Sequence, residues 1–197
     1  MATKSATRKK VTVIGVLHST KAVGSLQSFR KATTRLREKY PRMGVEKIVE
    51  PTPRGSSMRS DPAYRYFLGQ QKIAQRAKVK LEEIENPLAH RMRVDLGESM
   101  QAFAYDMHSG KKHELRVGKH IYGKFTHAEM SELVDAIDYF RSRMMENEAK
   151  KKGLEIMFVG VPHDRHIRSK GIKSSDAQLY AKYKTLISKI YRDLQRS

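Results

Sequence analysis

Two short polar segments of this sequence carry the residue types that acid–base and phosphate chemistry require. Each follows a short apolar run, Val11–Leu17 or Leu154–Val161, that is typical of a buried strand. If the two strands are parallel neighbours, the polar segments meet at the carboxyl edge of the sheet, where open α/β sheets bind ligands. The first segment contributes His18, Ser19, Thr20 and Lys21, and the second contributes His163, Asp164, Arg165 and His166.

These residues predict an anion-binding site at that edge. Ser19, Thr20, Lys21, Arg165 and His166 would hold a phosphate, and a helix expected to begin at Ser25 would point its N-terminus at the anion. His18 and His163 are candidate acid–base groups of a phosphoesterase. The segment after Gly15 lacks the Gly-Lys-Ser/Thr of a P-loop. The alternative is that both segments are ordinary connecting loops.

A second candidate is a hairpin expected from Met100–Met107 and His113–Val117. Asp106 followed by Glu114-Leu115-Arg116 loosely resembles the Asp…(Asp/Glu)-x-Lys layout of restriction-endonuclease-like nucleases. Two carboxylates on adjacent strands would share a Mg²⁺, and one of Glu82, Glu83 or Glu85 would add a ligand. Arg116 stands where those nucleases have a lysine, and a guanidinium is a poor general base. A solvent-facing charged hairpin is therefore the favoured interpretation.

No resident metal is expected. His163 and His166 are spaced like zinc ligands, but no third ligand has a matching spacing, and the sequence contains no cysteine. Mg²⁺ would be a cofactor only if the nuclease hypothesis holds.

The strongest functional signal is positive charge. Forty Lys and Arg against 21 Asp and Glu give a net charge of +19. Residues 1–45 contain 11 basic residues and one acid, and residues 162–197 contain nine basic residues and three acids. Such an excess exceeds what solubility needs, so a polyanionic partner is expected. Nucleic acid, either DNA or RNA, is the favoured partner, and an anionic membrane surface is the main rival.

The residues predicted to contact phosphates share a basic side chain and a place near either end of the chain. They are Lys4, Arg8, Lys9, Lys10, Arg30, Lys31, Arg35, Arg37, Lys39, Arg165, Arg168, Lys170, Lys182, Lys184, Lys189 and Arg192.

Helices and strands expected from apolar spacing would position these residues. The helix expected at Ser25 ends before Pro41, a short strand follows at Val45–Val49, and a long helix runs from Asp61-Pro62 to Glu85. A capping box at Thr126-x-x-Glu129 predicts another helix, which Gly153 ends. Ser174 or Ser175 begins a final helix. This order predicts an α/β or α+β domain with a small mixed sheet of about four or five strands and about four helices.

The predicted organisation is a flexible basic arm, residues 1–10, and a single domain, residues 11–197, in which residues 51–60 form a mobile loop. The absence of cysteine fits a reducing intracellular compartment, the cytoplasm or nucleoid. The first 37 residues contain no acid, so mitochondrial import stays open, although Val11–Leu17 would interrupt an amphipathic transit helix. No stretch reaches the ~20 apolar residues that a membrane span requires.

The favoured function is non-catalytic: an accessory protein that binds the phosphate backbone with low sequence specificity. The patterns show no helix-turn-helix, zinc-finger or RNA-recognition signature that would read bases. One alternative is a nucleic-acid-processing enzyme, either a Mg²⁺ nuclease or a phosphoesterase. Another is a structural component of a larger nucleoprotein or virion assembly.

Overall fold

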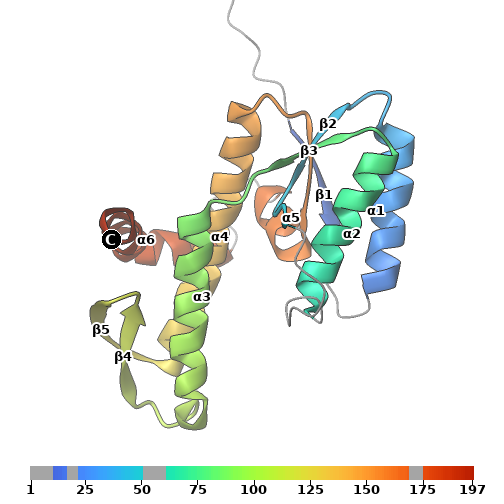
Figure 1. The fold of residues 1–197 in the computed structure, drawn as a ribbon. Coiled ribbons are helices and arrows are strands. Elements are labelled where there is room, and N and C mark those ends of the chain that lie inside the picture. The colour runs from blue at the N-terminus through green and yellow to red at the C-terminus, as the bar shows by residue number, and fades with distance from the viewer. Residues whose placement is uncertain (1–10, 17–21, 51–60, 169–174) are drawn as a thin grey trace, which may run out of the picture. The chain divides into compact units, whose positions relative to one another are not determined.

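The computed structural model describes residues 11–16, 22–50, 61–168 and 175–197 (Figure 1). These residues form six α-helices, a short 3-10 helix (η2, Ala104–Asp106), a four-stranded parallel sheet and a two-stranded antiparallel sheet. The mixed α/β class is confirmed, with more helices than expected. The chain, for which a single domain was predicted, divides into two compact units: Met1–Ile84 with Met145–Asp164, and Glu85–Met144 with Arg165–Ser197. The predicted arm and the 51–60 loop lie outside the described residues.

Unit 1 is built on the parallel sheet. Its strands are β1 (Thr12–Val16), β2 (Arg42–Val45), β3 (Lys80–Glu83) and β6 (Ile156–Gly160). They lie in the order β1-β6-β2-β3, with Thr12 opposite Ile156 and Gly44 opposite Met157. All five residues of β6 are buried, as expected of a central strand in a parallel sheet. The predicted strand pair Val11–Leu17 and Leu154–Val161 is therefore confirmed as parallel and adjacent.

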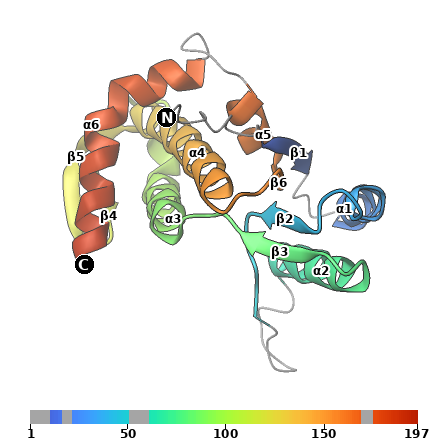
Figure 2. The same ribbon diagram turned by 90° about the horizontal axis from the view of Figure 1, so that it is seen from above.

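Two helices, α1 (Ala22–Leu36) and α2 (Pro62–Arg76), lie side by side on one face of this sheet (Figures 1 and 2). Phe29 of α1 packs edge-on against Phe158 of β6, with ring centroids 4.7 Å apart. Tyr66 and Ile73 of α2 belong to the same apolar cluster. Each helix joins two parallel strands, so each runs antiparallel to them, and its C-terminus lies at the amino edge of the sheet.

Three predictions for unit 1 were wrong in detail. The helix predicted to reach Glu85 ends at Arg76, because Lys78 turns the chain with a φ of 57° before β3 begins. Because Leu81 and Ile84 continue the apolar spacing of α2, the sequence pattern did not predict strand β3. The strand expected at Val45–Val49 lies three residues earlier, and Ser25 lies inside α1 rather than at its start.

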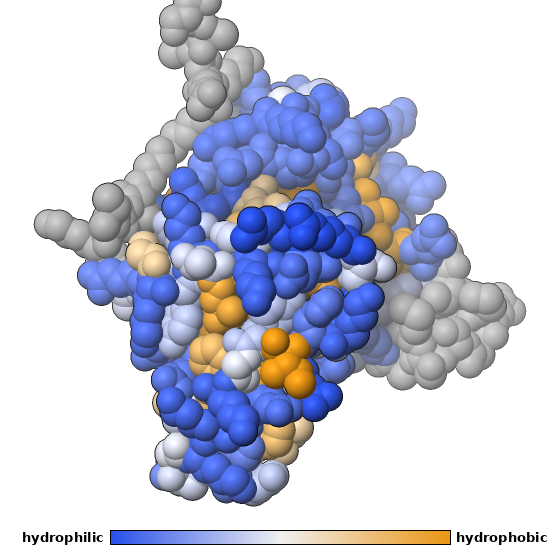
Figure 3. Space-filling model, turned by 90° about the vertical axis from the view of Figure 1, so that its left-hand side faces the viewer, coloured by the Kyte–Doolittle hydropathy of each residue, from blue (hydrophilic) through white to orange (hydrophobic). Residues whose placement is uncertain are grey.

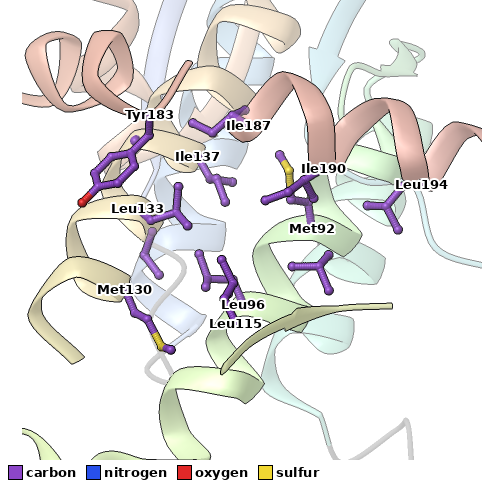
Figure 4. Packing of buried hydrophobic residues seen from close by; sticks show 13 residues of the cluster. Met92, Leu96, Leu115, Met130, Leu133, Ile137, Tyr183, Ile187, Ile190 and Leu194 are labelled. Carbon is purple, nitrogen blue, oxygen red and sulfur yellow. The ribbon is translucent and has the colours of Figure 1, made fainter. Parts of the chain in front are cut away.

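Unit 2 combines helices with a hairpin. It contains α3 (Pro87–Ala102), β4 (Lys112–Val117), β5 (His120–Thr126) and α6 (Ser175–Arg196), with the first part of α4 (His127–Lys151) and the end of α5 (Val161–Arg168). Figure 4 shows its core, in which side chains from α3, α4, α6 and β4 converge. Leu133 and Ile137 of α4 and Ile187 and Ile190 of α6 are fully buried there.

The capping box is confirmed at the start of α4. Thr126 N–H donates to Glu129 Oε2 at 2.8 Å, and Glu129 N–H donates to Thr126 Oγ1 at 3.2 Å. These bonds satisfy two backbone donors that a helix start leaves without partners.

Three further predictions were wrong. Met100–Met107 is the end of α3 followed by η2, and β4 pairs with His120–Thr126 instead. Pro87, interpreted as a helix stop, is the first residue of α3, with Asn86 as its cap. Residues 163–168, expected as a loop, form most of α5.

Candidate nucleic-acid interface

The basic residues of α1 are exposed on the side of the helix that faces away from the sheet. Phe29 and Thr33 are fully buried against the sheet, and Arg30, Lys31 and Arg35 are exposed. The apolar spacing that predicted the helix therefore also placed these three cations correctly on its outer surface.

Helix α2 carries a second row of cations that the sequence analysis missed. Arg65, Lys72 and Arg76 are seven and four residues apart, so they form one stripe along the helix. All three are exposed, whereas Tyr66 and Ile73 on the opposite side are buried. The seven- and four-residue spacing of these cations is the feature of the sequence that could have predicted the row.

The two rows belong to one surface because α1 and α2 touch. A Cβ added to Gly69 of α2 would lie 2.7 Å from Leu26 Cδ1 of α1, so only a glycine fits this crossing without displacing Leu26. Arg30 lies one turn beyond Leu26, and Arg65 and Lys72 lie within a turn on either side of Gly69. We call the six exposed cations the α1–α2 face: Arg30, Lys31, Arg35, Arg65, Lys72 and Arg76.

More cations gather at the amino edge of the same sheet, where helices α1, α2 and α4 end. Positive side chains are favoured at helix C-termini, which carry partial negative charge. Among the described residues, the carboxylates that pair with this group are Glu82, Glu146 and Glu148: Glu82 lies 3.2 Å from Arg42 and 2.9 Å from Lys80. We call this group the amino rim: Arg37, Lys39, Arg42, Lys78, Lys80, Lys150, Lys151 and Lys152.

The α1–α2 face differs from the amino rim in how its charge is balanced. In the described part of the chain, Arg30, Lys31, Arg35, Lys72 and Arg76 take part in no ion pair. Arginines and lysines held together without carboxylates repel one another, and a bound polyanion relieves that repulsion.

The carboxyl edge of the sheet, where an anion site was predicted, carries carboxylates in its described part. Gly160 N–H, at the junction of β6 and α5, donates to Glu46 Oε1, and Glu46 is only 8% exposed. Asp164 of α5 lies against Gly15 of β1, where an added Cβ would be 2.7 Å from Asp164 Oδ2. Burial raises the pKa of Tyr66 far above its usual value, and the nearby charge of Glu46 adds to the effect. The protein's own carboxylate thus supplies the negative charge at the start of α5.

The other residues predicted for this edge are dispersed. His163 is buried in the first turn of α5, and Arg165 and Arg168 are exposed further along the same helix. His18, Ser19, Thr20 and Lys21 lie outside the described residues, so their role stays a prediction. The same holds for Lys4, Arg8, Lys9, Lys10 and Lys170.

His166 instead belongs to a buried network in unit 2. Its Nδ1 lies 3.0 Å from Ser142 Oγ, and its Nε2 lies 3.1 Å from Asp176 Oδ2. This arrangement superficially resembles a Ser-His-Asp triad. However, Ser142 is fully buried in α4, and its hydroxyl donates to Asp138 O at 2.6 Å. A substrate cannot reach this hydroxyl, so the network is structural.

The predicted hairpin carboxylates do not converge on a shared metal. Asp106 lies in η2, where its Oδ2 is 2.9 Å from His113 Nε2 and 3.4 Å from Lys111 Nζ. Glu114 follows His113 on β4, so the two side chains point to opposite faces of the hairpin. Glu114 pairs with Arg116 at 2.8 Å. No cluster of three or more His, Asp or Glu side chains in the described ranges is arranged to hold a metal ion.

The cations of α6 are partly engaged within unit 2. Lys182 Nζ lies 2.5 Å from Glu132 Oε2, and Lys189 Nζ lies 5.6 Å from the centroid of the Tyr122 ring. Lys184 and Arg192 are exposed. Over α6 and the hairpin, Figure 3 shows a mostly hydrophilic surface with small, separate hydrophobic areas. Phosphate binding by α6 stays a prediction.

None of the helices in the described ranges combines the length and apolar character needed to cross a bilayer. Comparison of the chain with known protein families, curated proteins and solved structures gave no match.

Proposed function

We propose that this chain binds the phosphate backbone of a nucleic acid through the α1–α2 face and the adjoining amino rim of unit 1. The observation that carries the proposal is the pair of exposed cation rows on two touching helices, most of whose cations form no ion pair with a carboxylate among the described residues. Neutralising phosphates with Lys and Arg releases condensed counterions, which makes such binding strong at low salt and independent of sequence.

The position of the charge favours backbone contact over base reading. Arginine and lysine side chains on the outer surface of two helices can contact phosphates, whereas recognition of base edges requires an element that enters a groove of the duplex. We therefore expect similar affinity for different sequences of one nucleic-acid type, and a role as an accessory, non-catalytic binding protein.

A salt titration with matched charge variants tests the proposal. The first variant combines Arg30→Gln, Arg35→Gln and Arg76→Gln, and the control combines Lys112→Gln, Lys119→Gln and Lys124→Gln. The three control lysines are exposed in unit 2, and their loss lowers the net charge by the same amount.

We expect the first variant to bind every sequence more weakly and to lower the slope of log affinity against log salt by roughly 2 to 3, because each phosphate contact contributes about 0.9 on duplex DNA. The control should keep most of the wild-type slope. Equal losses for both variants would mean that net charge attracts the nucleic acid and that the α1–α2 face has no special role. A loss confined to one sequence would contradict backbone binding.

A further inference from the structure

A cavity of about 190 Å³ opens at the amino rim of unit 1. Its walls are Lys39–Arg42, where α1 leads into β2, and Gly153–Glu155, where α4 leads into β6. A volume of this size is well below that of sites for drug-sized ligands, so it suits one flat ring system.

The cavity wall offers an aromatic ring next to a cation. Tyr40 is half-buried, and Lys39 Nζ lies 5.2 Å from the centroid of its ring. Flat heterocycles stack on such rings, and stacking on aromatic side chains is how proteins hold unpaired bases.

A fixed hydrogen-bond donor stands beside that ring. The Arg42 guanidinium is held by Glu82 Oε1, 3.3 Å from Nε and 3.2 Å from Nη2, and by Lys152 O, 3.3 Å from Nη2. Hydrogen bonding to Lys80, with Arg42 nearby, lowers the pKa of Glu82, so this anchor stays charged at neutral pH. Glu155 also lines the cavity. An aromatic ring beside a charged donor matches a nucleobase, whose face can stack and whose edge carries hydrogen-bond acceptors.

Gly153 of the cavity wall has a φ of 67°, and no atom lies within 4 Å of the position that its Cβ would take. Glycine adopts this left-handed conformation without strain, so the wall carries no side chain at this point.

The cavity lies in the same unit as the proposed phosphate contacts. Lys39 and Arg42 belong to both the cavity wall and the amino rim, and Arg35 and Arg37 are within five residues of Tyr40. A strand whose phosphates continue from the α1–α2 face onto Lys39 and Arg42 of the amino rim would pass the opening of the cavity.

From these observations we infer that the cavity takes one unpaired nucleobase, so that the chain prefers single-stranded over regular duplex nucleic acid. This inference rests on the proposed function. A base inside a regular duplex is stacked and paired and cannot enter, whereas a base in a single strand turns out of the strand at low cost.

The chain contains no tryptophan, so Tyr40→Trp places a single indole in the cavity as a fluorescent reporter. Its fluorescence would be followed during titration with three 12-mers of equal phosphate number: single-stranded DNA, duplex DNA, and an abasic single strand that has phosphates but no bases. Fluorescence anisotropy of labelled 12-mers would report binding of each one separately. Tyr105→Trp is the control, because Tyr105 is 78% exposed and belongs to unit 2, whereas the cavity belongs to unit 1.

We expect all three 12-mers to bind at low salt and only the base-bearing single strand to quench the Tyr40→Trp indole. Tyr40→Ala should weaken single-strand binding about tenfold, as loss of one stacked base does, and Tyr40→Phe should restore it. Binding of all three without selective quenching would overturn the base pocket and leave the proposed function standing. If none of the 12-mers binds, the proposed function fails and the inference fails with it.

Discussion

The Glu46 carboxylate accepts a hydrogen bond from the backbone N–H of Gly160, and so joins the end of β2 to the start of α5. The contact puts a negative charge at a helix N-terminus, where the helix dipole favours it. Among the described residues, this carboxylate lies at the carboxyl edge of the sheet, and the cations of the amino rim lie at the opposite edge.

Loss of this contact should weaken unit 1. Glu46→Ala leaves the buried Gly160 N–H without its carboxylate, which should cost about 1 to 3 kcal/mol in the free energy of unfolding. Glu46→Gln keeps an oxygen acceptor and should cost clearly less. Urea denaturation of both variants measures the difference, and equal losses would show that the charge, rather than the hydrogen bond, is what matters.

Gly44 should resist substitution. An added Cβ would lie 2.9 Å from Met157 Cβ on the neighbouring strand β6. That atom is fixed to the backbone of a paired strand, so Gly44→Ala forces the strands apart and should destabilise the protein by about 1 to 3 kcal/mol.

Gly97→Ala is the matched control for Gly44→Ala. Its added Cβ would meet only Arg93 Nη1, at 3.0 Å, and this end of a long side chain can move. Because alanine favours the helix interior by about 1 kcal/mol, this variant should be neutral or more stable. A greater loss from Gly97→Ala than from Gly44→Ala in thermal denaturation would contradict the described strand packing.

The capping box at the start of α4 gives a third prediction. Thr126→Ala removes the Oγ1 that accepts the Glu129 N–H, and helix caps of this kind contribute about 1 kcal/mol. Thr126→Ser keeps the hydroxyl and should retain most of the stability. Urea denaturation measures the free energy of unfolding of both variants. Equal values would mean that the Thr126 hydroxyl does not contribute to stability.

Asp135 gives a prediction about pH. Although Asp135 is exposed, partial desolvation raises the pKa of its carboxyl above the ordinary 3.8, with Asp176 and Asp138 adding to the effect and His166 opposing it. A raised carboxyl pKa means that the folded state holds the proton more tightly. The resulting stability is present below the ordinary pKa and is lost as pH rises through the raised value.

Asp135→Asn removes that titration. We expect the variant to match the wild type at low pH and to exceed it in stability at pH 7, as measured by urea midpoints across the range. A variant that is less stable at pH 7 would show that the charged Asp135 makes a favourable contact, and that this contact outweighs the cost of desolvating its carboxylate and the repulsion from Asp176 and Asp138.

Apolar spacing predicted the structure best where a segment has one buried side. It placed α4 and α6 close to their observed bounds because their apolar residues repeat along one face, and it placed β1 and β6 because a short continuous apolar run is typical of a strand in a parallel sheet. It failed at Lys78, where a positive φ falls on a residue without the usual turn chemistry of glycine or asparagine. It also failed at Pro87, because a proline marks a helix start as readily as a helix end.

The sequence predicted only part of the candidate site. The cations of α1 stand out because few acids surround them. The cations of α2 join this surface only because Gly69 packs against Leu26 of α1. These two residues are more than 40 positions apart in the sequence, so apolar spacing within one helix does not reveal their contact. The cavity depends in the same way on β6 lying beside β2.

The position of β6 also has a consequence for how the protein is made. This strand separates β1 from β2 in the sheet, yet it is the last of the four to be synthesised. Until residues 156–160 emerge from the ribosome, β1 has no neighbour and the edge of β2 is open. Long-range strand pairing of this kind is slow and leaves unpaired edges exposed. The growing chain therefore holds an incomplete sheet until residues 156–160 have been made, and unit 1 closes only after that point.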